Sequence, residues 1–223
     1  MIHNKYKEYI FDKVLSSDVK IILPEINDNR VISAINKMKK IGFNFVDLNE
    51  FSENHNFYKN QLYSKDFIKN WTEEMVDKYI ENSLIKGLLI LDNDNCDCLV
   101  AGATISTAEV IKSSIRIVGV NNKWVSSCFL MLNYEHDNVF TYSDCGVIPE
   151  PNEEQLALIA FNAAKSHKLL TNIEPRVVFL SFSTKGSADH YKVKRMQDAV
   201  KIFSNKHPNI IHDGEMQFDA AIN

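Results

Sequence analysis

The sequence predicts an α/β fold, because short apolar runs typical of strands alternate with longer stretches of helical periodicity. The apolar runs are nearly continuous, as in strands buried in a parallel or mixed sheet. Between them, apolar residues recur at three- and four-residue steps; Val31, Ile35 and Met38 are one example. A chain of 223 residues, 45% of them apolar, is long enough to bury one large core or two small ones.

The part of the chain before Pro149 contains most of the predicted strands. They lie at 19–25, 43–48, 87–91, 98–103, 115–119, 125–132 and 139–146. Helices are expected at 4–16, 30–41 and 73–86, the second of them capped by Asp28 or Asn29. Residues 49–72 are polar and aromatic, and they predict a variable loop or short helices.

Pro149 and Pro151 mark the expected domain boundary, which divides the chain into domains 1–147 and 148–223. Asn152 is followed three residues later by Gln155, a capping-box pattern that predicts a helix start. The buried face of this helix is expected to hold Leu156, Ile159, Ala160 and Ala163. A strand at 176–182, a helix at 189–206 and a strand at 209–213 complete the expected elements.

Charge and composition exclude several classes of protein. The net charge is −4 and the pI about 6.0, and the basic stripe that nucleic-acid binding requires is absent. No stretch approaches the length of a membrane span, and the first residues lack the apolar core of a signal peptide, so we expect a cytoplasmic protein without membrane contact. Cys96 and Cys98 could bind a metal with Asp94, but free cysteines that pack as small apolar groups are the favoured interpretation.

Three segments leave a predicted strand through small polar residues and enter a helix: 23–31, 101–110 and 181–190. Each could hold phosphate or carboxylate, because helix N-termini offer free N–H groups and ligands bind beyond the carboxyl ends of strands in open α/β sheets. The patterns GxxxxGK[ST] and GxGxxG are absent, which argues against a P-loop NTPase and a standard dinucleotide-binding domain. On spacing alone, helix capping by Ser183, Ser187 and Asp189 is favoured over ligand binding.

Carboxylates near the C-terminal end of the sequence offer a further alternative. Asp213, Glu215 and Asp219 could gather a divalent cation through oxygen ligands. Carboxylates that merely solvate a turn are more common, and this interpretation is favoured.

Longer strings carry more information than these spacings. In order along the chain, LVAGA, VSSCFLM, DCGVIPEPNEEQLALIA, EPRVVFLSFST and DGEMQFDAA resemble the phosphate acetyltransferase (phosphotransacetylase) family of the phosphate acetyl/butyryltransferase superfamily. The resemblance runs from about residue 19 to the end of the sequence. It implies a two-domain, three-layer α/β/α fold like that of isocitrate and isopropylmalate dehydrogenases.

The resemblance also implies a reaction. The family moves an acetyl group between acetyl-CoA and phosphate, giving acetyl phosphate and CoA, in a cleft between the two domains. Coenzyme A is then a substrate, no metal or other cofactor is expected, and the protein is expected to form a homodimer.

The sequence departs from the family pattern at several positions. Ile105, Lys112 and Ser113 stand where the family has histidine, arginine and proline, and Asp66 stands where it has arginine. The serine, arginine and aspartate of the family's NDLSRG region have no counterpart in these 223 residues. The catalytic residues of this chain are therefore unknown, the fold is expected to be incomplete at its C-terminus, and little acetyl transfer is expected of the chain alone.

The resemblance nevertheless marks candidate substrate-binding residues. These are Thr107, Lys112, Ser126, Ser127, Ser183, Thr184 and Gly186. Lys112 is expected to contact phosphate, and the turn 183–187 to supply hydroxyl and N–H groups. Asp144 is expected to fix the hinge between the domains rather than to act as a base.

Two alternatives remain open at this point. The chain could be a non-catalytic relative that binds CoA or an acyl phosphate, or one that needs a partner chain to supply the catalytic segment. An oxidoreductase of the same fold is less favoured, because the sequence has no dinucleotide fingerprint.

Overall fold

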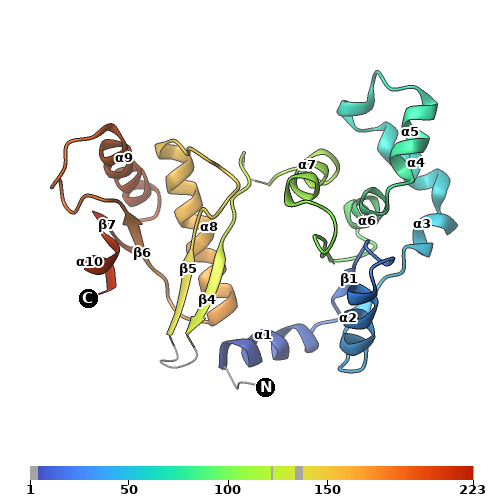
Figure 1. The fold of residues 1–223 in the computed structure, drawn as a ribbon, viewed down its shortest axis with the longest axis horizontal. Helices are drawn as coiled ribbons and strands as arrows, with labels where there is room; N and C mark the ends of the chain where they lie inside the picture. The colour runs from blue at the N-terminus through green and yellow to red at the C-terminus, as the bar shows by residue number, and fades with distance from the viewer. Residues whose placement is uncertain (1–4, 122, 134–137, 223) are drawn as a thin grey trace. The chain divides into compact units, whose positions relative to one another are not determined.

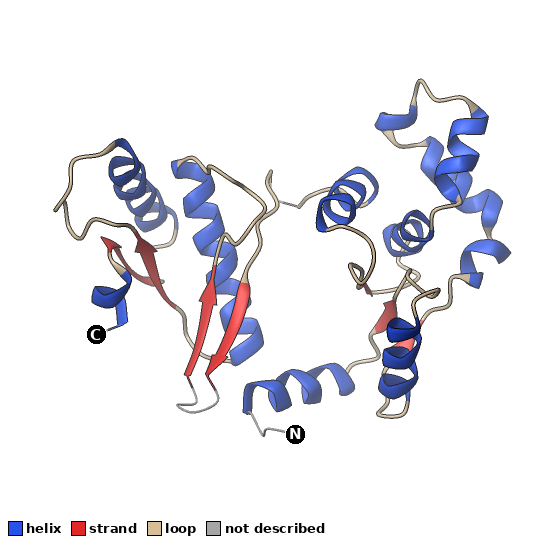
Figure 2. Ribbon diagram, in the orientation of Figure 1, coloured by secondary structure: helices blue, strands red, loops and turns tan. Residues whose placement is uncertain are grey.

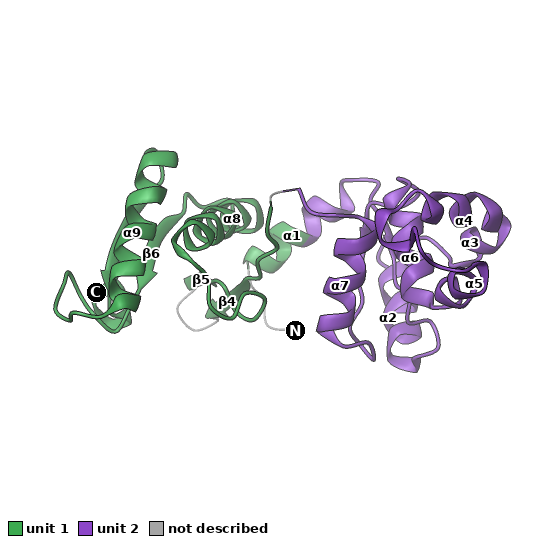
Figure 3. Cartoon of the chain, turned by 90° about the horizontal axis from the view of Figure 1, so that it is seen from above, with its two compact units in different colours: residues 1–10, 122–223 green, residues 11–121 purple. Residues whose placement is uncertain are grey.

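The computed structural model describes residues 5–121, 123–133 and 138–222. Helices and strands are mixed along the chain and two of the three sheets are parallel, which confirms the predicted α/β class (Figures 1 and 2). The chain divides into two compact units, one of residues 11–121 and the other of residues 1–10 and 122–223 (Figure 3). The predicted domain boundary at 147 and 148 stays a prediction.

The unit of residues 11–121 is built on a small parallel sheet. Strand β1 (Lys20–Ile22) lies between β2 (Asn44–Phe45) and β3 (Cys98–Leu99). The helices are α2 (Asn29–Lys39), α3 (Asn49–Glu53), α4 (His55–Tyr63), α5 (Glu73–Ile80), α6 (Ser83–Asp92) and α7 (Thr107–Ile117), with a short 3₁₀ helix, η1 (Asp66–Ile68). Asp28 caps α2 by accepting a hydrogen bond from the Arg30 N–H. The start of this helix, within the segment 23–31, is therefore already bound by a carboxylate of the chain itself.

Helix α6 forms the centre of this unit and corrects the sequence prediction. Residues 87–91, expected as a strand, lie within α6, which begins after the N-cap Asn82. Residues 87–90 of the helix are all buried, so this apolar run has the appearance of a buried strand. The expected strand at 115–119 is likewise wrong, because its first residues form the last turn of α7.

The other unit contains two two-stranded sheets. Strands β4 (Phe129–Asn133) and β5 (Asn138–Tyr142) are antiparallel, whereas β6 (Arg176–Leu180) and β7 (Ile211–Met216) are parallel. The helices are α8 (Glu153–Thr171), α9 (Tyr191–Lys206) and α10 (Phe218–Ile222), and α1 (Lys5–Leu15) begins in this unit and ends in the other. The capping box of Asn152 and Gln155 is confirmed at the start of α8.

The core of this unit lies between α8, α9 and β6. It consists of Ala157, Ala160, Phe179, Ala199 and Phe203. The alternating exposure of β4 leaves Phe129 and Met131 61% and 53% exposed, so this strand has one free face, unlike the fully buried strand that its apolar run predicts. Among the described residues, no helix has the length and apolar character that a membrane crossing requires.

Candidate functional site

Three loops that follow strands are each held by one internal carboxylate. Glu25 binds the loop after β3, Asp144 the loop after β5, and Glu215 the turn after β6. Glu25 and Asp144 each accept several hydrogen bonds from backbone N–H groups, and Glu215 accepts one from a backbone N–H and one from a hydroxyl. Such bonds rigidify a loop without regular secondary structure. These loops contain or adjoin most of the predicted substrate-binding residues.

Glu25 lies in a nest of N–H groups at the start of the segment leading to α7. Its oxygens accept hydrogen bonds from the N–H groups of Gly102, Ala103, Thr104 and Ile105 at 2.8, 2.9, 2.5 and 2.8 Å, and from the Thr104 hydroxyl at 2.8 Å. Burial alone would raise the pKa of Glu25, but the hydrogen bonds from residues 103–105 outweigh it and lower this pKa to about 2. The carboxylate of Glu25 therefore binds the N–H groups of residues 102–105, which the sequence analysis expected to bind a substrate anion.

Thr107 and Lys112 extend from α7, beyond this nest. Thr107 is the first residue of the helix, after the N-cap Ser106, and its side chain is exposed. Lys112 is exposed on the same helix. Both side chains are therefore open to solvent within their own unit.

Asp144 organises the loop after β5. Its carboxylate accepts hydrogen bonds from the N–H groups of Gly146, Val147 and Ile148 at 3.2, 3.3 and 2.9 Å, and from the N–H and hydroxyl of Ser127. Although burial raises the pKa of Asp144, these hydrogen bonds lower it below its ordinary value. The carboxylate is ionised at neutral pH and engaged in these hydrogen bonds, and its expected role at the hinge between the domains stays a prediction.

The two predicted serines before β4 have different partners. The Ser127 hydroxyl donates to Asp144 and accepts from the Cys145 N–H at 3.1 Å, so it joins the lead into β4 to the loop after β5. The Ser126 hydroxyl accepts a long hydrogen bond, 3.3 Å, from the Asn162 side chain on α8. The Ser127 hydroxyl therefore donates its proton to Asp144, whereas the Ser126 hydroxyl acts as an acceptor in this contact.

Glu215 holds the turn at 183–188 from the neighbouring strand β7. This carboxylate is only 2% exposed. It accepts hydrogen bonds from the Gly186 N–H at 2.6 Å and from the buried Ser183 hydroxyl at 3.1 Å. Burial raises the pKa of Glu215, but these bonds outweigh it and lower the pKa. In the described part of the chain, no group of three or more His, Cys, Asp or Glu side chains is arranged to hold a metal ion.

The predicted residues thus fall into groups. Ser183, Thr184 and Gly186 share one turn, Ser126 and Ser127 precede one strand, and Thr107 and Lys112 share one helix. The groups lie in two units, so their assembly into one site stays a prediction. Sequence reasoning missed the role of Glu25 and underestimated Glu215, although Glu25 lies in the segment 23–31 that the sequence marked and Glu215 lies in the family string DGEMQFDAA.

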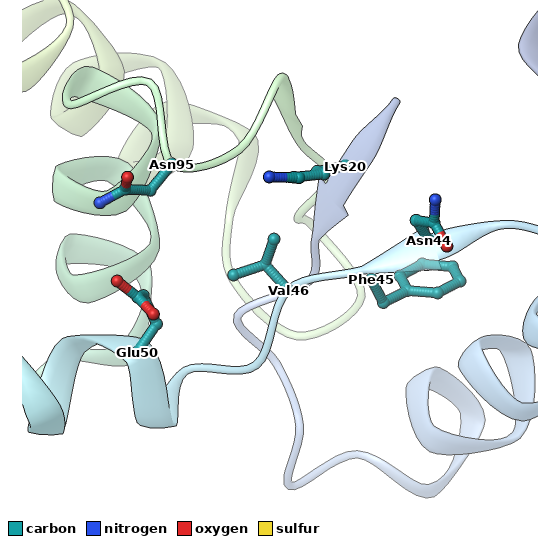
Figure 4. A pocket seen from close by; sticks show the side chains of 6 residues that line it. All are labelled: Lys20, Asn44, Phe45, Val46, Glu50 and Asn95. Carbon is teal, nitrogen blue, oxygen red and sulfur yellow. The ribbon is translucent and has the colours of Figure 1, made fainter. Parts of the chain in front are cut away.

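A pocket of about 400 Å³ lies elsewhere in the unit of residues 11–121 (Figure 4). It is lined by Lys20, Asn44, Phe45, Val46, Glu50 and Asn95. Lys20 is the first residue of β1, residues 44–46 cover the whole of β2 and the residue after it, and Glu50 belongs to α3. No predicted substrate-binding residue lines this pocket.

The fold and its loops define a class: an α/β protein with rigid polar loops at the carboxyl ends of strands, as in enzymes that bind anionic substrates. Residues 40–223 match the family described as Phosphate acetyl/butaryl transferase, and the chain belongs to this family.

Relatives and solved structures agree with this membership. The phosphate acetyltransferase of Acetivibrio thermocellus is 32% identical over 246 residues, which cover 97% of this chain and 74% of the relative. That of Thermoanaerobacterium thermosaccharolyticum is 33% identical, with 96% and 74% covered. A phosphotransacetylase structure from Streptococcus pyogenes matches with a TM-score of 0.86 and 26% identity, over 97% of this chain and 73% of that one.

Proposed function

We propose that this protein is an acyltransferase that converts acetyl-CoA and phosphate into acetyl phosphate and CoA, and catalyses the reverse reaction. The match of residues 40–223 to the family carries this proposal, together with relatives and solved structures that are phosphate acetyltransferases. In the forward direction a phosphate oxygen attacks the thioester carbon, the C–S bond breaks, and the CoA sulfur leaves as a thiolate that takes up a proton.

The loops support roles for the candidate residues. Thr107, Lys112 and Thr184 would contact substrate through their side chains, with the Lys112 ammonium facing phosphate. Ser127 and Ser183 would act indirectly, because their hydroxyls already donate to Asp144 and Glu215. Gly186 would allow close approach to the turn, since its backbone has a φ of +81° and a Cβ there would meet no other atom within 4 Å.

We further propose that coenzyme A serves as a substrate with no additional cofactor, in a cytoplasmic homodimer. The exposed apolar side chains of β4 and β5 support an association between copies, because Phe129, Met131 and Phe140 share one exposed face. The proposed two-domain fold of the dehydrogenase type, with its boundary at 147 and 148, rests on the family resemblance. Light scattering on the purified chain tests the dimer.

The acetyl-transfer activity is tested with the purified chain in both directions. Acetyl phosphate and CoA should yield acetyl-CoA, measured by thioester absorbance, and acetyl-CoA with phosphate should yield free thiol. Both conversions should be slow, since the departures from the family pattern predict little acetyl transfer by this chain alone. Omission of phosphate is the control for simple thioester hydrolysis. Binding of CoA without turnover would favour the non-catalytic alternative, and the absence of both would contradict the proposal.

A further inference from the structure

The turn at 183–188 presents one cation in an unusual backbone conformation. Lys185 has a φ of +49° and Gly186 a φ of +81°, so two consecutive residues are left-handed. Glycine adopts this conformation readily, but lysine does not. Positions of this kind persist where the surroundings impose them, and they occur often at functional sites.

Glu215 supplies the constraint on Lys185. The Lys185 N–H donates to the Glu215 backbone carbonyl at 3.0 Å, and the next N–H, of Gly186, donates to the Glu215 carboxylate at 2.6 Å. The Ser183 hydroxyl donates to the same carboxylate oxygen and accepts from the Ala188 N–H at 3.2 Å. Glu215 therefore holds the turn on both sides of Lys185.

The same bonds occupy the backbone donors of the turn. The N–H groups of residues 183–188 donate to Ser181 Oγ, Ser187 Oγ, Glu215 O, Glu215 Oε1, Thr184 O and Ser183 Oγ, in that order. An anion bound by this turn must then be recognised through side chains. Lys185 is the only cationic side chain within 181–188.

The Lys185 ammonium is paired but accessible. It forms an ion pair with Asp213 of β7, and both side chains are 56% exposed. It also lies 3.4 Å from the Gly214 carbonyl oxygen. An ion pair this exposed contributes little stability, so a more strongly charged anion is able to replace Asp213. The turn follows the carboxyl end of β6, where ligands of α/β sheets bind.

We propose that Lys185 binds the phosphoryl group of phosphate or acetyl phosphate, and that Glu215 is a positioning residue that fixes the turn bearing this lysine. The identity of the anion rests on the proposed acetyl-transfer function. The turn thus contributes a side-chain ammonium to the phosphate site, in place of the N–H groups that the sequence predicts. Asp213 competes with phosphate for the same ammonium.

The first experiment measures binding of inorganic phosphate to the full chain by calorimetry, which needs no turnover. Lys185→Met should weaken phosphate binding at least about tenfold, a loss expected for one charge-assisted contact, and Lys185→Arg should restore part of it. Asp213→Asn should tighten binding severalfold. The control is Lys201→Met, since Lys201 is also exposed and paired with a carboxylate, Asp198, on α9 of the same unit.

The second experiment tests positioning by Glu215. Glu215→Gln should weaken phosphate binding while CoA binding, measured in parallel, stays unchanged. The double variant Lys185→Met/Glu215→Gln should bind phosphate no more weakly than Lys185→Met alone, because both changes act through one ammonium. Additive losses, or equal losses for CoA, would assign Glu215 a purely structural role and overturn that part of the proposal.

The outcomes also separate this inference from the proposed function. The role of Lys185 is overturned if the unaltered chain shows no saturable phosphate binding, or if Lys185→Met and Lys201→Met bind phosphate equally well. Acetyl transfer by a Lys185→Met variant with unchanged phosphate binding supports the function and refutes the inference. Phosphate binding that depends on Lys185 in a chain without acetyl transfer refutes the function and supports an anion site.

Discussion

At the scale of single residues, the most informative feature is the use of carboxylates as internal loop anchors. Glu25, Asp144 and Glu215 each accept hydrogen bonds from backbone groups that have no partner in a helix or sheet. A buried donor that loses its acceptor costs more than the net value of one hydrogen bond. Substitution of these residues should therefore destabilise the protein more than substitution of exposed acidic residues does.

Glu25→Gln tests this for the loop at 102–105. The amide keeps one acceptor oxygen and turns an NH₂ group toward N–H donors, so we expect a loss of about 3 kcal/mol in the free energy of unfolding. Urea denaturation at neutral pH measures it. Glu53→Gln, a change at an exposed glutamate of the same unit, should stay within about 0.5 kcal/mol. Equal effects of the two changes would contradict the anchoring role of Glu25.

Asp144 and Ser127 provide a graded comparison in the other unit. Asp144→Asn replaces a carboxylate oxygen that accepts hydrogen bonds from N–H groups, and it should lower the free energy of unfolding by about 2 kcal/mol. Ser127→Ala removes one hydroxyl and should lower it by about 1 kcal/mol. Hydrogen exchange should show faster exchange of the Gly146, Val147 and Ile148 amides in Asp144→Asn. Slower or unchanged exchange at these amides would argue against the role assigned to Asp144.

At the scale of elements, the β6–β7 pair depends on a glycine. Gly214 has a φ of +143°, and a Cβ there would lie 2.8 Å from Phe179 Cβ and 2.9 Å from the Phe179 carbonyl oxygen. Its pairing partner in β6 is this same phenylalanine. The close approach of backbone to backbone leaves no room for a side chain.

Gly214→Ala should therefore destabilise the chain more than Gly186→Ala does. Both positions have positive φ, which costs an L residue roughly 1–2 kcal/mol, but a Cβ at Gly186 meets no atom within 4 Å. The clash with Phe179 should add about 1–3 kcal/mol to the loss for Gly214→Ala. Thermal unfolding of both variants measures the difference, and similar midpoints would count against the close packing of the two strands.

The elements also show how far the sequence predicts the structure. The capping box of Asn152 and Gln155 was predicted correctly, because its signal is local. The helix at 83–92 differs from the strand that the sequence predicts at 87–91, because an unbroken apolar run lacks the periodicity that distinguishes a helix from a strand. Similarly, the exposure of one face of β4 depends on which elements pack against the strand, and the local sequence does not determine those elements.

The candidate site was predictable to a similar extent. The family strings located the turn at 183–187 and the serines before β4, but not the partners of their hydroxyl and N–H groups. Those partners are distant in sequence: Glu25 lies 77 positions from Gly102, and Glu215 lies 29 from Gly186. Pairings over such separations follow from tertiary packing rather than from local patterns.

At the scale of the whole molecule, the internal carboxylates should make the protein sensitive to acid. The hydrogen bonds that each receives lower the pKa of Glu25, to about 2, and those of Asp144 and Glu215 below their ordinary values. In the unfolded chain these carboxyl groups have pKa values near the ordinary ones. The unfolded chain therefore binds protons at a pH where the folded chain does not. Their contribution to stability is complete above those ordinary values and is lost as the pH falls toward the folded-state values.

We expect the urea midpoint to fall steeply as the pH is lowered from about 5 toward about 2. In Glu25→Gln the titrating group is absent, so the stability gap between this variant and the unaltered chain should narrow over the same range. Added salt screens exposed pairs such as Lys194–Asp198 but not the buried bonds of Glu25, so it should not restore the lost stability. A gap that stays constant from neutral to acid pH would mean that Glu25 titrates alike in the folded and unfolded chain, against the hydrogen-bonded nest that the structure shows.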